Sequence, residues 1–183
     1  DRGEFERAIA HFDELIRENP ETVEYRWNRA LCYLQHGDFS RGWQDYELRH
    51  VRGGRDVRRD FGLPVWDGNT PAGSSVLVYG EQGVGDEIMF ASCLLDLIER
   101  RAGVVLECDA RLATLFARSF PAIVVHGAAR DGNRAWLHRY PALKAQIALG
   151  SLPGMLRTSA EKFPKYGGYL VADPARIERW RLR

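Results

Sequence analysis

The sequence predicts an α+α/β protein in which helical hairpins are followed by a parallel α/β domain. Two observations support this fold class. Small and aromatic residues recur at a fixed period over residues 1–50, and from Ser74 onward short apolar runs alternate with patterns of helical spacing. Strands joined by helices are typical of a parallel sheet with right-handed crossovers. The 183 residues leave room for one ordinary domain or two small ones.

The N-terminal residues 1–50 contain an internal repeat. Gly-Glu-Phe at residues 3–5 recurs as Gly-Asp-Phe at residues 37–39, an offset of 34 residues (37 − 3). Small and aromatic residues at fixed places in such a period are typical of the tetratricopeptide repeat. We expect the second helix of one repeat, then helices at 21–36 and 40–50; a plain helical hairpin is the alternative. Repeats bury their faces against neighbours, so further repeats or the next domain should cover them.

Residues 51–73 are predicted to be a linker, because arginines, glycines and prolines replace the helical periodicity. Phe61 and Trp66 are expected to pack on a neighbouring domain. The arginines are interpreted as a solvated connector, with an anion-binding patch as the alternative. They are Arg52, Arg55, Arg58 and Arg59.

Residues 74–183 show the strand and helix alternation of a parallel α/β domain. Residues 135–143 are ambiguous, and Asp173-Pro174 is typical of a helix start. The expected strands are 75–79, 104–108, 123–126 and 146–149, and the expected helices are 86–101, 110–120 and 174–183.

The stretch from Val76 to Phe90 is the predicted site, because ligands of open α/β sheets bind at the carboxyl ends of strands. An apolar run enters a glycine-rich turn that opens into a helix. A phosphate-binding Walker loop is rejected, because Asp86 and the acid after it stand where that loop needs lysine. A dinucleotide fingerprint is weak, because Ile88 occupies the place of its third glycine.

The sequence Gly-Glu-Gln-Gly-Val-Gly-Asp-Glu-Ile-Met-Phe at 80–90 resembles bacterial tetratricopeptide proteins that carry a glycosyltransferase-like domain. Pro-Val-Trp-Asp-Gly at 64–68 and Leu-Gly-Ser-Leu-Pro at 149–153 agree, and the resemblance covers nearly the whole chain. It implies the two-lobed GT-B architecture. The chain would hold the last repeats and the N-terminal Rossmann-like half, with helix 174–183 leading towards an absent C-terminal half.

The Gly-Asp turn at 85–86 also resembles the lipopolysaccharide heptosyltransferases, whose aspartate is thought to act as base on the acceptor hydroxyl. This resemblance implies that role for Asp86; a simple helix-capping role is the alternative. The neighbouring polar residues would hold acceptor hydroxyls or cap backbone groups. The expected acceptor-binding residues are Glu81, Gln82, Gly83, Gly85 and His126.

The resemblance therefore implies a fragment of a glycosyltransferase that moves a sugar from a nucleotide-sugar donor to an acceptor hydroxyl on a sugar or protein. Its repeats would bind a protein or peptide. The donor is expected to bind only with the missing C-terminal half, so the fragment alone should hold no cofactor tightly and be inactive. The alternative is a non-catalytic repeat scaffold with a Rossmann-like binding platform.

Composition excludes several other classes of protein. A net charge of +1 gives no basic field for nucleic acid, and no apolar run is long enough to span a membrane. Cys32, Cys93 and Cys108 are odd in number and lack Cys-x-x-Cys spacing, which argues against disulfides or a zinc site. We expect no metal and a reducing, cytoplasmic location.

Overall fold

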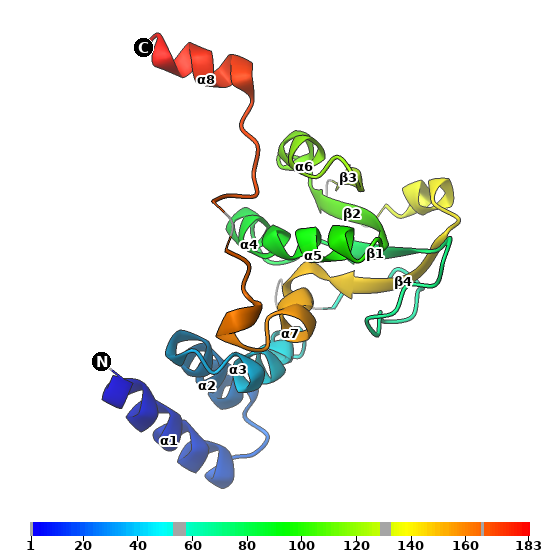
Figure 1. Ribbon diagram of the computed structural model, residues 1–183. Coiled ribbons are helices and arrows are strands. Elements are labelled where there is room, and N and C mark those ends of the chain that lie inside the picture. Colours follow the sequence, from blue (N-terminus) through cyan, green and yellow to red (C-terminus); the bar gives the residue numbers. More distant parts are fainter. Residues whose placement is uncertain (1, 53–57, 129–132, 166) are drawn as a thin grey trace. The chain divides into compact units, whose positions relative to one another are not determined.

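The computed structural model describes residues 2–52, 58–128, 133–165 and 167–183 (Figure 1). It divides into two compact units: Asp1–Arg59 with Ser151–Pro164, and Asp60–Gly150 with Lys165–Arg183. The first unit is helical and the second contains a parallel sheet, so the predicted α+α/β class is confirmed. Arg55 of the predicted linker lies outside the described residues.

Three helices form the first part of the helical unit: α1 (Arg2–Glu18), α2 (Val23–His36) and α3 (Phe39–Tyr46). Helix α2 packs against both of the others. Gly37 ends α2 in the left-handed conformation at φ 88°, which glycine adopts without steric cost. Gly42 lets α3 approach α2 closely, because a Cβ there would lie 2.6 Å from Leu34 Cδ2. The short 3₁₀ helix η1 (Glu47–His50) follows α3.

Arg29 of α2 joins all three of these helices. Its guanidinium donates to Asp13 of α1 at 2.6 Å and to Asp45 of α3 at 2.6 and 3.0 Å. The Arg29 side chain is 20% exposed and Asp45 is 17% exposed, so water only partly screens this pairing. A charged residue in the middle helix therefore fixes the register of both neighbours.

The helical unit also includes a segment far along the sequence, Ser151–Pro164, which contains α7 (Leu152–Leu156) and the 3₁₀ helix η6 (Ala160–Lys162). Helix α7 packs on α3. The indole N–H of Trp43 donates to the Arg157 carbonyl at 2.9 Å, and the rings of Phe39 and Phe163 lie 4.6 Å apart. Helix α7 was not predicted from the sequence, and it covers part of α3.

The second unit is built on a four-stranded parallel sheet with strand order β3-β2-β1-β4. The ends of every strand lie within three residues of the predicted ends. The strands are β1 (Ser75–Tyr79), β2 (Gly103–Asp109), β3 (Val124–Ala128) and β4 (Leu143–Ala148).

Helices follow β1 and β2 and lie over the sheet (Figure 1). The predicted helix 86–101 is divided into α4 (Val84–Phe90), the 3₁₀ turn η3 (Ala91–Cys93) and α5 (Leu94–Glu99). Ser92 Oγ donates to the Met89 carbonyl at 3.0 Å, and such a side-chain bond competes with the regular helical pattern. Helix α6 (Ala113–Ser119) packs on β3.

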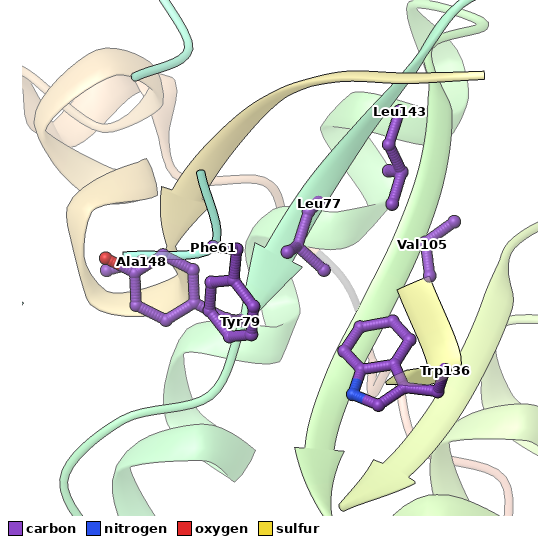
Figure 2. Packing of buried hydrophobic residues seen from close by; sticks show 7 residues of the cluster. All are labelled: Phe61, Leu77, Tyr79, Val105, Trp136, Leu143 and Ala148. Atoms are coloured by element: carbon purple, nitrogen blue, oxygen red, sulfur yellow. The ribbon is translucent and has the colours of Figure 1, made fainter. Parts of the chain in front are cut away.

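An aromatic cluster forms on the face of the sheet that carries Leu77, Tyr79 and Val105, as Figure 2 shows. The centroid of the Phe61 ring lies 5.3 Å from that of Tyr79 and 6.3 Å from that of Trp136. Trp136 belongs to the 3₁₀ helix η4 (Ala135–Arg139). Phe61, near the middle of the segment predicted as a linker, thus packs within the α/β unit.

Buried Gln146 of β4 attaches residues 60–66 to the sheet. Its side-chain oxygen accepts from the Phe61 amide at 2.8 Å, and its backbone exchanges two 2.8 Å bonds with Pro64 and Trp66. Trp66 is 4% exposed, and its indole N–H donates to the Asn69 carbonyl at 2.8 Å. The aromatic residues of the predicted linker are therefore core residues of the α/β unit.

The described part of the chain ends with α8 (Pro174–Arg181), where Asp173 caps the helix by accepting from the Ala175 amide at 2.9 Å. None of the described helices combines the length and apolar character needed to cross a membrane. Cys32, Cys93 and Cys108 form no disulfide in the described part of the chain.

Candidate functional site

The glycine loop after β1, residues 80–83, lies where the strand order reverses. From β1 the chain adds β2 and β3 on one side, whereas β4 pairs with the other side of β1. Ligands of open α/β sheets bind outside the carboxyl ends of strands at such a point. The loop therefore lies at the carboxyl end of β1, as the sequence predicts.

Glu81 joins this loop to the 3₁₀ turn η5 (Leu149–Ser151), which follows β4. Its Oε1 accepts a hydrogen bond from the Gly150 amide at 3.1 Å, and Glu81 is only 5% exposed. A Cβ on Gly150 would lie 2.5 Å from the same oxygen, so the contact needs glycine there. Glu81 thus holds the backbone across the strand-order reversal.

Glu87, in the first turns of α4, joins the loop to the other neighbouring strand. Its Oε2 accepts from the Asp109 amide at 2.9 Å at the end of β2, and Glu87 is 1% exposed. A Cβ on Gly80 would lie 2.6 Å from its carboxylate. This role of Glu87 was not predicted from the sequence; the available signal was an acid six residues after Glu81, beside an apolar helix stripe.

Asp86 remains partly exposed and accepts from the Gly83 amide at 3.1 Å. This bond closes the first turn of α4 in the manner of a capping box. Gln82 adopts a left-handed backbone at φ 60°, which is uncommon for a residue with a side chain. Gln82, Gly83, Gly85 and Asp86 therefore form one partly open surface at the start of α4, whereas Glu81 is buried beneath it.

His126 lies two strands away from the glycine loop, in register with Glu107, which in turn pairs with Tyr79. Its ring stacks on Trp136 with centroids 4.1 Å apart and planes at 19°. It lines a cavity of about 340 Å³ whose described lining residues include none from 80–86. The structure thus keeps His126 apart from the other predicted acceptor-binding residues.

The pKa of His126 lies below its ordinary value. Burial of the ring is the main cause, and the Arg139 charge acts in the same direction while Glu107 opposes both. Within the described ranges, no group of three or more histidines, cysteines or acids is placed to hold a metal ion.

Comparison with known proteins supports the assignment of the helical unit. Residues 1–56 match the tetratricopeptide repeat family. This segment is a tetratricopeptide region. The whole chain is 34% identical, over 198 aligned residues, to Protein FlbA of Caulobacter vibrioides, and it spans 33% of that protein. No solved structure matches the chain. The tetratricopeptide part of the predicted resemblance is confirmed, and these comparisons give no support to the glycosyltransferase part.

Proposed function

We propose that this chain is a protein-interaction module, in which the tetratricopeptide helices bind a segment of another protein. The observation that carries the proposal is the family match over residues 1–56 together with the packing of α1, α2 and α3. Stacked helical repeats create extended surfaces that suit peptide binding. The α/β unit would act as the platform from which the repeats are presented.

The surface that fits this role is one face of α2. Exposed residues recur along it with spacings of four, three and four, which places them on a single helical stripe. Leu31 stands at its centre and is 38% exposed, so the stripe offers an apolar contact among polar neighbours. The four residues of the stripe are Glu24, Asn28, Leu31 and Gln35.

A photo-crosslinking experiment in cells tests this proposal. A photoreactive benzoylphenylalanine replaces Leu31 in one variant and Val51 in the control, since Val51 is also exposed, at 65%, but lies off α2. We expect a partner that crosslinks from position 31 and not from position 51. Leu31→Glu should then weaken its affinity about tenfold, as expected for loss of one buried apolar side chain. Equal crosslinking from both positions contradicts the proposal.

We also propose a second function, the acceptor side of a sugar-transfer site, because the glycine loop lies at the strand-order reversal. Asp86 would be the base on the acceptor hydroxyl. Gln82, Gly83 and Gly85 would hold that acceptor, with His126 a more distant contact. The donor would be a nucleotide sugar bound largely by another part of the whole protein.

Asp86→Asn tests this second proposal in the intact gene product, assayed for transfer from a panel of nucleotide sugars. Asparagine keeps an oxygen that can accept from the Gly83 amide, so the first turn of α4 should persist. Loss of the base should lower turnover by about 10²–10⁴-fold. If Asp86→Asn changes neither the turnover nor the melting temperature, Asp86 is a helix cap and not the base.

A further inference from the structure

The cavity beside His126 has the size and chemistry of a small-molecule site. Its volume of about 340 Å³ is close to the lower end of ligand pockets, which run from about 300 to 1,000 Å³. It opens at the carboxyl end of β3, and its lining includes His126, Gly127, Asn133, Trp136 and Arg139.

Trp136 gives this cavity a fixed wall. It is 8% exposed and belongs to the cluster labelled in Figure 2. Its ring is oriented edge-on to that of Phe61, with centroids 6.3 Å apart. The His126 ring lies nearly flat on the indole at 4.1 Å. Stacking sets the plane of the imidazole, while among the described residues no partner is hydrogen-bonded to its ring nitrogens. His126 is therefore held in place with its polar edge available.

Arg139 supplies a positive charge to the same cavity. It is exposed at the end of η4, and no described carboxylate forms an ion pair with it. Its charge acts on His126 strongly enough to help lower the pKa of that ring, although burial is the larger cause. Buried Glu107 lies in register with His126 on the neighbouring strand. The His126 imidazole and the Arg139 guanidinium thus line one cavity.

We propose that this cavity binds a small ligand through an oxyanion group, a carboxylate or a phosphate, held by the Arg139 guanidinium and the edge of His126. The guanidinium fork matches either group with two parallel hydrogen bonds. The adjoining His126 can donate a further bond when protonated. The lining of this cavity includes no residue of the α2 stripe or of the glycine loop, and the proposal does not depend on the function proposed for either.

The test follows the imidazole signal of His126 by NMR while inorganic phosphate, and separately acetate, is added to the whole chain. His126→Gln identifies that signal among those of the five histidines. We expect saturable binding in the millimolar range, together with a rise in the pKa of His126, because a bound anion favours the imidazolium. Preference for phosphate indicates a phosphoryl ligand, and equal or stronger binding of acetate indicates a carboxylate.

Two arginine variants make the result specific. Arg139→Gln should lower the affinity for the anion by at least about tenfold, the loss expected when a charge-assisted hydrogen bond is removed. Arg100→Gln removes one positive charge from an exposed position in the same unit and should leave binding unchanged. If neither anion shifts the His126 titration, or if both variants weaken binding equally, the proposal is wrong.

Discussion

The contact between Gly80 and Glu87 leads to a quantitative prediction about the glycine loop. A Cβ at position 80 would lie 2.6 Å from Cδ and Oε1 of Glu87, whose carboxylate is 1% exposed and bonded to the Asp109 amide. Gly80→Ala therefore forces a methyl group into a buried carboxylate. Overpacking of this kind costs about 1–3 kcal/mol of unfolding free energy.

Glu87→Ala should also destabilise the α/β unit, because the Asp109 amide loses its charged acceptor. Loss of such a hydrogen bond costs about 1.5–3 kcal/mol. The two effects should not add, since the three atoms nearest to the added methyl at position 80 all belong to the carboxylate that Glu87→Ala removes. We expect Gly80→Ala with Glu87→Ala to cost about 1–3 kcal/mol less than the sum of the single variants.

Native-state amide exchange in β1 and β2 measures these values, because it reports opening of the α/β unit separately from that of the helical unit. Gly85→Ala is the matched control: a Cβ there meets nothing within 4 Å, so this variant should be neutral or slightly more stable. Additivity of the two single variants within about 0.5 kcal/mol would refute the packing argument.

Three further predictions concern other parts of the chain. Arg29→Met removes the hydrogen bonds to Asp13 and Asp45 and should lower the unfolding free energy of the helical unit by about 2–3 kcal/mol. Arg41→Met changes a side chain that is 62% exposed and should alter this free energy by less than about 1 kcal/mol. Denaturant unfolding followed by amide exchange in α2 compares the two variants. The lowered pKa of His126 means that the unfolded chain binds more protons, so the unfolding free energy should rise with pH up to about pH 6.5, and His126→Gln should flatten that rise in urea titrations. Residues 1–183 should bind no nucleotide in the micromolar range, and calorimetry showing such binding would revive a dinucleotide site.

The sequence predicts the centre of the parallel sheet well because β1 and β2 are buried on both faces. Val76 to Tyr79 and Val104 to Leu106 are continuous apolar runs, and such runs are typical of central parallel strands. The start of β4 is harder to predict, because exposed Lys144 interrupts its apolar pattern. Helix α7 was missed since it is only five residues long and its stability comes from packing on α3, which local periodicity does not report.

The candidate site is predicted only in part, because local sequence cannot tell an open acid from a buried one. Glu81, Asp86 and Glu87 lie within seven residues of each other in the sequence, yet only Asp86 stays partly exposed. The other two accept backbone amides from residues 150 and 109, contacts that depend on the strand order. His126 was predicted at the end of its strand, whereas β3 continues to Ala128, and its stacking partner Trp136 belongs to a 3₁₀ helix whose structure was ambiguous in the sequence.

The tetratricopeptide helices depend on a segment that comes after the sheet in the chain. Residues 151–164 supply the Arg157 carbonyl to Trp43 and the ring of Phe163 to Phe39. A polypeptide of residues 1–59 lacks both contacts and leaves the face of α3 open to water. Because repeats need covered faces, we expect this polypeptide to lose cooperative thermal unfolding, measured by circular dichroism, while the whole chain keeps it. A polypeptide of residues 1–59 that melts as sharply and at the same temperature as the helical unit in the whole chain would show that the later segment is not needed.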